Sequence, residues 1–177
     1  MDTWRSDPAE GGGCLMDYAS HVVDLLNYVL SPVSEVKSSR LRSVFSNKVD
    51  DSVYAMLKLS NGLNGMLSVD WSDETHRKMT TSITISGTKG KIISDANELK
   101  VFYKTDDFPA GYTKGWNIKY VTELTPEVDF YLRGEEYSAQ IDYFIKAIKG
   151  EVKNDINTFE SALLTDKALK LIRQNAS

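Results

Sequence analysis

The chain has 177 residues, of which 41% are hydrophobic and 26% charged, the composition of a soluble globular domain. Its 21 basic and 25 acidic residues give a formal net charge of −4 and are mixed along the chain, which excludes a nucleic-acid or anionic-membrane surface. Cys14 is the only cysteine, so an internal disulfide is excluded, and this usage suits a reducing cytoplasm.

The amino end has neither the basic nor the apolar region of a signal peptide. It carries instead a Trp4-Arg5 pair and the glycine triplet 11–13, and no helix or strand is predicted before them. The best apolar run, 22–30, is broken by two polar residues and is too short to cross a membrane. We therefore expect a cytoplasmic domain cut from a longer protein.

An amphipathic helix is predicted from about Cys14 to Leu30, and Ser31-Pro32 ends it. Its apolar residues recur at helical spacing and should form the buried face: Leu15, Ala19, Val22, Val23, Leu26 and Leu30.

The hydrophobic period then changes to two, which predicts strands at 33–45, 52–60, 63–71, 80–86, 91–94, 99–103 and 116–124. Asn61-Gly62 is a strong two-residue hairpin signal, because both turn positions favour positive φ. Residues 87–90 predict a second hairpin, and 105–115 a surface loop.

Two helices are expected at the carboxyl end. The first spans 135–149 with Gly150 after it, and its apolar side is Tyr137, Ile141, Phe144, Ile145 and Ile148. The second should be capped by Asn157 with Glu160 three residues on, and it carries Ala162, Leu163, Leu169 and Ile172. The pattern predicts one α+β domain over 1–177, with a largely antiparallel or mixed sheet of about six strands and helices packed on one face.

The first helix carries the main candidate site. Asp17, His21 and Asp24 follow at spacings of four and three, which stack their side chains along one helical face. A histidine between two carboxylates is poised for proton transfer. The glycine triplet lets other backbone or a ligand approach the helix start, and the helix N-terminus supports the charge of Asp17. The alternative is a polar stripe on a half-exposed helix.

The other candidate motifs are less specific. Zinc would need a third and a fourth ligand, for which the chain offers only His76 and Cys14, so we predict no metal. No Gly-x-Gly-x-x-Gly occurs, and the 87–90 turn joins two strands, so we expect no cofactor on this chain alone.

Aromatic and basic groups leave several alternatives open. Trp4-Arg5 can stack on and hydrogen-bond a sugar-like ligand or anchor a loose terminus. Trp71 and Trp116 are expected in the core or at an interface. Residues 76–78, His-Arg-Lys, read as a solvated basic turn, or as a group that reaches a substrate phosphate or carboxylate.

Residues 4–26, Trp-Arg-Ser-Asp-Pro-Ala-Glu-Gly-Gly-Gly-Cys-Leu-Met-Asp-Tyr-Ala-Ser-His-Val-Val-Asp-Leu-Leu, closely resemble the start of the C-terminal domain of the Gfo/Idh/MocA oxidoreductases. These are the relatives of glucose–fructose oxidoreductase and inositol 2-dehydrogenase. The segment Ile83-Thr-Ile-Ser-Gly-Thr-Lys-Gly resembles the family's strand and hairpin. The segment Arg133-Gly-Glu-Glu-Tyr-Ser-Ala-Gln-Ile-Asp-Tyr-Phe and the closing helix resemble its last two helices.

The resemblance implies a GAPDH-like C-terminal domain that supplies the substrate site and the oligomer interface. An N-terminal Rossmann domain, absent from this chain, would hold NAD or NADP. It further implies that His21 is the acid/base residue at the substrate hydroxyl, and that Asp17 orients it and holds a neighbouring hydroxyl. We place the substrate-binding residues around them: Trp4, Arg5, Tyr18 and Asp24.

The chain departs from the family pattern in three ways. Ala19 stands where members usually have glycine. The family's catalytic lysine, in a Glu-Lys-Pro segment of the Rossmann domain, has no counterpart here. The usual first strand before Trp4 is also missing, which leaves a sheet edge open. The isolated chain is therefore predicted neither to bind NAD(P) nor to oxidise sugars.

The expected parent reaction is hydride transfer between a nicotinamide cofactor and a secondary alcohol of a sugar, inositol or nucleotide sugar. The alternatives are an NAD-dependent glycosidase of the same family and a non-catalytic oligomerisation or ligand-binding module. With helices on one sheet face only, Val53, Ala55, Leu57 and Leu59 or their alternates should face outward, which predicts a homodimer or homotetramer through that face.

Overall fold

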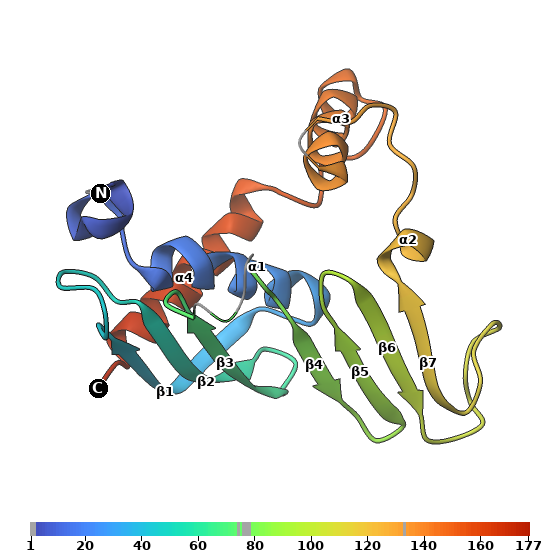
Figure 1. The fold of residues 1–177 in the computed structure, drawn as a ribbon, viewed down its shortest axis with the longest axis horizontal. Coiled ribbons are helices and arrows are strands. Elements are labelled where there is room, and N and C mark those ends of the chain that lie inside the picture. Colours follow the sequence, from blue (N-terminus) through green and yellow to red (C-terminus); the bar gives the residue numbers. More distant parts are fainter. Residues whose placement is uncertain (1–2, 74, 76–78, 133) are drawn as a thin grey trace. The chain divides into compact units, whose positions relative to one another are not determined.

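The computed structural model describes residues 3–73, 75, 79–132 and 134–177. The chain forms two compact units, one of residues 1–75 with 154–177 and one of residues 76–153 (Figure 1). Both units contain an antiparallel sheet and at least one helix, so the predicted α+β class is confirmed. None of the helices in the described part of the chain is long and apolar enough to cross a membrane.

The first unit opens with two 3-10 turns, η1 (Trp4–Ser6) and η2 (Pro8–Glu10). The expected helix follows, but it is made of two kinds of turn. Its first turn is π-helical, η3 (Leu15–Ala19), and only the rest is α1 (Ser20–Val29). A π turn is wider than an α turn and changes which side chains share a face. The extent of the predicted helix is therefore right, but its regular 3.6-residue period is wrong at the start.

Three strands form the first sheet, in the order β1 (Val33–Arg42), β2 (Ser52–Leu59) and β3 (Asn64–Asp70). The hairpin predicted at Asn61-Gly62 joins β2 to β3, and Gly62 has a φ of +86°. The first strand ends at Arg42, not at residue 45 as predicted. There the carboxylate of Asp51 accepts the N–H groups of residues 44–46 and turns the chain out of the sheet.

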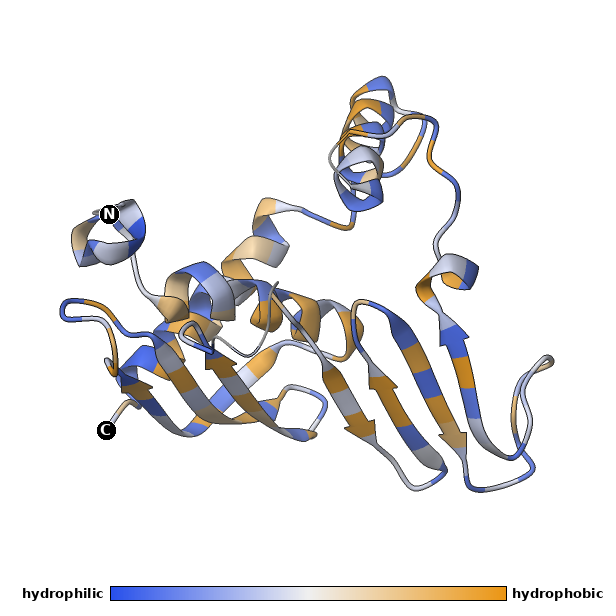
Figure 2. Cartoon of the chain, viewed as in Figure 1, coloured by the Kyte–Doolittle hydropathy of each residue, from blue (hydrophilic) through white to orange (hydrophobic). Residues whose placement is uncertain are grey.

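Helix α4 (Phe159–Gln174) packs on α1 and β1 over one face of this sheet. The core comprises Cys14, Leu15, Ala19 and Val23 from the first helix, Val53, Ala55, Leu57 and Leu59 from β2, and Ala168, Leu169 and Ile172 from α4. Because successive strand residues point to opposite faces, Tyr54 and Met56 are exposed on the other side. Figure 2 shows hydrophilic and hydrophobic residues following one another along the strands. The prediction of helices on one face is therefore confirmed for this sheet. The outward-facing residues of β2 are those that alternate with Val53, Ala55, Leu57 and Leu59.

The cap of α4 differs from the prediction by one residue. The hydroxyl of Thr158 accepts the N–H of Ser161 at 3.1 Å, and Ser161 in turn accepts the N–H of Thr158. The predicted pair, Asn157 with Glu160, does not form the box. Both pairs have the spacing of a capping box, so the residue at which the helix begins decides which pair forms it.

The second unit contains the four-stranded sheet β4 (Ile83–Ser86), β5 (Gly90–Ser94), β6 (Glu98–Tyr103) and β7 (Gly115–Tyr120). The seven strands thus form two hydrogen-bonded sheets and not one sheet of about six. The last strand stops at Tyr120, because the carboxylate of Glu123 accepts the N–H of Tyr120 and starts the short helix α2 (Val121–Leu124). Helix α3 (Glu135–Lys149) ends at Gly150, which has a φ of +74°, as predicted.

Candidate functional site

At the glycine triplet the backbone of an earlier segment packs directly against the chain. A Cβ on Gly12 would lie 2.4 Å from the carbonyl oxygen of Arg5, a distance that excludes any side chain. Gly13 has a φ of +107° and donates its N–H to that same oxygen at 3.0 Å. The close approach predicted from the triplet is therefore made by the chain's own segment at residues 4 and 5.

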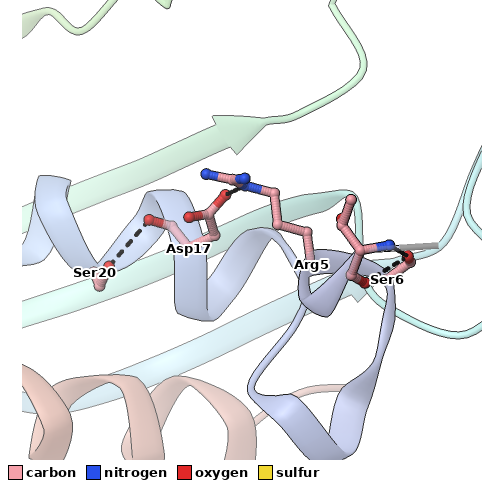
Figure 3. A network of polar contacts seen from close by, with 5 residues as sticks. Arg5, Ser6, Asp17 and Ser20 are labelled. Atoms are coloured by element: carbon pink, nitrogen blue, oxygen red, sulfur yellow. Dashed lines mark hydrogen bonds and ion pairs between the residues drawn. The ribbon is translucent and has the colours of Figure 1, made fainter. Parts of the chain in front are cut away.

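This approach brings Arg5 to the first helical turn. Its Nε donates to Oδ2 of Asp17 at 2.8 Å, and Figure 3 shows the two side chains pointing toward one another. The Asp17 side chain is 11% exposed and that of Arg5 is 50% exposed. The guanidinium also lies over the ring of Trp4, 4.7 Å from its centroid. Three of the predicted site residues, Trp4, Arg5 and Asp17, are thus brought together.

His21 lies in a different environment from Asp17. It is exposed at the start of α1 and lines a hollow of about 340 Å³ between α1 and the beginning of α4. The other described residues that line the hollow are Asp24, Leu25, Asn27, Tyr28, Ile156, Asn157, Ser161 and Leu164. Among the residues that the structure describes, Asp17 hydrogen-bonds through its carboxylate to Arg5 and not to His21. The expected stacking of the two side chains assumed α-helical geometry, whereas Asp17 lies in the π turn.

Asp24 joins the two helices that border this hollow. Its Oδ1 accepts the hydroxyl of Thr165 on α4 at 2.9 Å. The same hydroxyl accepts from Nδ2 of Asn27 at 3.2 Å, and Oδ1 of Asn27 accepts the N–H of Val33. Thr165 is buried, so this network connects α1, α4 and β1 through the interior. The structure therefore gives Asp24 an internal partner in addition to its place beside His21.

Tyr18, also predicted in the substrate site, packs against an aromatic residue of the first unit. Its ring centroid is 5.8 Å from that of Trp71, with the two planes at 58°. Both residues lie against the hydrophobic core and are partly buried. For Trp71 this agrees with the first of the two predicted positions, in the core or at an interface. Trp116, by contrast, is half-exposed on β7 and stacks on Phe102.

Two adjacent acidic residues that the sequence analysis missed organise this region. Oδ2 of Asp50 accepts the N–H of Leu15 at 2.6 Å, and the main-chain oxygen of Asp50 accepts the N–H of Cys14 at 2.7 Å. Asp51 is buried. Burial alone raises its pKa, but hydrogen bonds from the N–H groups of Val44, Ser46 and Phe45 outweigh burial and leave the pKa lowered. In the sequence these residues appear only as an Asp-Asp pair before a strand. The pattern does not indicate that Asp50 contacts Leu15, because Leu15 is 35 residues away.

Cys14 is fully buried, which confirms its interpretation as a packing residue. Burial first, and then the negative charges of Asp50, Asp70, Asp51 and Asp17, together raise the pKa of its thiol to about 12. The thiol is therefore neutral at physiological pH. The predicted basic turn at residues 76–78 lies outside the described residues.

The glycine-rich segments do not form a cofactor site in the described chain. The space beside Gly12 is filled by backbone, and a Cβ on Gly90 would collide with the carbonyl oxygen of Phe102 on the neighbouring strand. Neither segment leaves N–H groups arranged around an open space for a phosphate. These two segments therefore form tight backbone contacts and not phosphate-binding loops.

A family model described as the GFO/IDH/MocA C-terminal domain matches residues 1–93 of the 177. A search of curated proteins finds no match. Levoglucosan dehydrogenase in complex with NADH and levoglucosan is similar in structure, with a TM-score of 0.74, 23% identity, and coverage of 98% of this chain and 52% of that one.

Two further solved structures share the fold. An NAD-binding oxidoreductase from Klebsiella pneumoniae has a TM-score of 0.77 at 20% identity, covering 98% of this chain and 51% of that one. The WlbA dehydrogenase from Bordetella pertussis, in complex with NADH and UDP-GlcNAcA, has a TM-score of 0.68 at 22% identity, with 98% and 45% covered. The chain thus spans about half the length of these proteins.

Proposed function

Since the chain belongs to the Gfo/Idh/MocA family through its C-terminal domain, we propose that it is the substrate-binding and oligomerisation domain of an NAD(P)-dependent oxidoreductase. The parent enzyme transfers a hydride between the nicotinamide and a secondary alcohol of a sugar, inositol or nucleotide sugar. The cofactor is held by a part of the enzyme outside this chain.

The observation that carries this proposal is the arrangement around the first helix. Asp17 is held by Arg5 in the π turn, and His21 follows at the start of α1, exposed at a hollow. An exposed imidazole can reach a bound ligand, which a core histidine cannot. Arg5 and Trp4 present a guanidinium and an indole, groups suited to hydrogen-bond and stack on a sugar ring.

His21 takes the proton of the substrate hydroxyl as the alcohol is oxidised and returns it in the reverse direction. General acid–base catalysis of this kind contributes about 10²- to 10⁴-fold to the rate. Asp17, fixed by Arg5, holds a neighbouring hydroxyl and sets the orientation of the reacting carbon. Tyr18 and Asp24 complete the substrate surface on the same helix.

The solved relatives support a sugar-like substrate. One is a levoglucosan dehydrogenase with levoglucosan bound, and another binds the nucleotide sugar UDP-GlcNAcA. Exposed apolar side chains on both sheets support a homodimer or homotetramer, namely Tyr54, Met56 and Met66 on the first sheet and Trp116, Ile118 and Tyr120 on the second. We also propose a cytoplasmic location, from the single cysteine.

The test uses the natural polypeptide that contains this chain. It is incubated with NAD⁺ or NADP⁺ and a set of neutral sugars, inositols and nucleotide sugars, and the products are identified by mass spectrometry. A keto product with an equal amount of reduced cofactor supports the proposal. Free sugar without net cofactor reduction indicates the glycosidase alternative instead.

The His21→Ala variant separates the enzyme from the non-catalytic module. We expect turnover to fall at least about tenfold, from the loss of the proton-transfer group. Lys170→Ala, an exposed residue of α4, is the matched control and should keep full turnover. Unchanged turnover in His21→Ala would reject the assigned role of the histidine.

A further inference from the structure

The helix that carries Asp17 and His21 is capped from a distant part of the chain. Cys14 occupies the capping position but makes no side-chain cap. The carboxylate of Asp50 accepts the N–H of Leu15 at 2.6 Å, and its main-chain oxygen accepts the N–H of Cys14 at 2.7 Å. Two of the N–H groups that a helix start leaves without an internal partner are thus satisfied by one residue.

The position of Asp50 is itself tightly restricted. Its Oδ1 lies only 2.7 Å from where a Cβ of Gly13 would be, so the carboxylate fits against the backbone of a residue with a φ of +107°. The next residue, Asp51, donates its N–H to Arg42 and accepts the N–H of Trp71. Its buried carboxylate accepts three further N–H groups. Asp50 is therefore held in place from both sides.

The same contacts lead directly to the proposed site. Leu15 is the first residue of the π turn, and Asp17 is the third. The N–H of Asp17 donates to the carbonyl oxygen of Gly13 at 3.0 Å, and its carboxylate meets Arg5 at 2.8 Å. A shift at Leu15 or Gly13 would move Asp17 relative to Arg5, because Leu15 is in the same π turn as Asp17 and the main chain of Gly13 bonds both Asp17 and Arg5.

We propose that Asp50 is a positioning residue: its carboxylate sets where the π turn begins and so where Asp17 meets Arg5. The part of this inference that concerns turnover rests on the proposed function, whereas the part that concerns the Arg5–Asp17 pair does not. Asp50 acts through Leu15 and Asp17 and is assigned no contact with the substrate.

Three substitutions separate geometry from charge. Asp50→Asn keeps an oxygen that can accept from Leu15 but removes the charge. Asp50→Glu keeps the charge but adds a methylene group, which changes where the carboxylate lies relative to the N–H of Leu15. Asp50→Ala removes the acceptor. Asp95→Ala is the control, since Asp95 also accepts two backbone N–H groups, in the turn between β5 and β6, and shares no element with Asp17.

The first readout is the Nε–H resonance of Arg5, measured by NMR on ¹⁵N-labelled protein. The hydrogen-exchange rate of the Leu15 amide is measured on the same samples. We expect the wild-type signal in Asp50→Asn and Asp95→Ala, and a shifted or rapidly exchanging signal in Asp50→Glu and Asp50→Ala. The wild-type signal in both Glu and Ala variants would overturn the proposal. If Asp50→Ala does not fold, the contrast between the Asn and Glu variants decides alone.

The second readout is turnover of the natural polypeptide. We expect kcat of Asp50→Glu to fall about 10- to 100-fold, the effect of a small misplacement of a catalytic group, with KM changed by less than about threefold. Asp50→Asn should keep kcat within about threefold of wild type, because the acceptor is retained. Equal losses in the Asn and Glu variants would reject a geometric role. If His21→Ala leaves turnover intact, the proposed function fails, and the NMR result still decides the role of Asp50.

Discussion

Nε of Arg5 donates to Oδ2 of Asp17 across 12 residues, at a distance of 2.8 Å. The bond joins the 3-10 turn at the amino end to the π turn that begins the first helix. The Asp17 side chain is nearly buried, so without Arg5 its negative charge would have little compensation from solvent. The glycine triplet makes this bond possible, because Gly12 lets the Arg5 backbone lie against it.

We expect Arg5→Lys to behave like Arg5→Ala in the parent enzyme. A lysine ammonium has no planar Nε and cannot lie over Trp4 while it bonds Asp17 in the same geometry. Both variants should lower kcat/KM at least about tenfold. The unfolding free energy should change by no more than about 1 kcal/mol, since Arg5 is half-exposed. Steady-state kinetics and urea unfolding measure the two effects, and a Lys variant with normal kcat/KM would contradict the prediction.

The thiol of Cys14 should not react in the folded protein. It is fully buried, and a pKa raised to about 12 leaves almost no thiolate at neutral pH. A chromogenic disulfide reagent should therefore titrate no thiol in the native protein and one thiol per chain in denaturant. Rapid reaction of the native protein at the rate of a free cysteine would show that the core around Cys14 opens.

Asp51 should make stability depend on pH in the acid range. Its folded-state pKa lies below the ordinary value of 3.8, so the folded state favours the ionised form. The resulting stabilisation is fully present above the unfolded-state pKa and is lost as pH falls through the folded-state value. In urea unfolding, Asp51→Asn should cost about 1–3 kcal/mol at neutral pH, because a buried charged acceptor is replaced. The difference from wild type should shrink below the ordinary carboxyl pKa, and a constant difference would argue against Asp51.

Thr165 should stabilise the contact between α1 and α4 through its hydroxyl alone. Thr165→Val keeps the shape but leaves Asp24 and Asn27 without their shared partner. We expect it to lower the unfolding free energy by about 1–3 kcal/mol, the cost of unsatisfied polar groups. Thr165→Ser retains the hydroxyl and should cost less than half of that. Equal losses in the two variants would attribute the effect to packing of the methyl group.

The outer face of the first sheet should mediate self-association. Met56 and Met66 are paired across β2 and β3 and are 53% and 87% exposed. We expect light scattering to give a dimer or tetramer for the wild type and a smaller species for Met66→Lys, because a charge would then be buried in the interface. Ala162→Lys, on the exposed side of α4, is the control and should not change the mass. A wild-type monomer would reject the proposed interface.

Local patterns predicted much of the fold correctly. The helical spacing from Leu15 to Leu26 indicated which residues enter the core, and Asn61-Gly62 indicated the hairpin between β2 and β3. These features depend on neighbours within a few residues, through helical period and turn dihedrals. The motif from Trp4 to Leu26 was also sufficient to indicate the family, which the match over residues 1–93 confirms.

The partners of the charged groups were decided by the tertiary structure. Sequence spacing placed His21 next to Asp17, but the first helical turn is π-helical and Arg5 comes within 2.8 Å of Asp17. The role of Asp50 could not be predicted from local patterns, because its partner Leu15 lies 35 residues before it. Hydrogen bonds and ion pairs depend on distances of about 3 Å between atoms, which the folded chain sets and sequence spacing does not. The sequence by itself determined the three main helices, the two predicted hairpins and the core residues of the first helix, because these follow from the helical period and from turn dihedrals. Only the folded chain determined which carboxylate meets which donor.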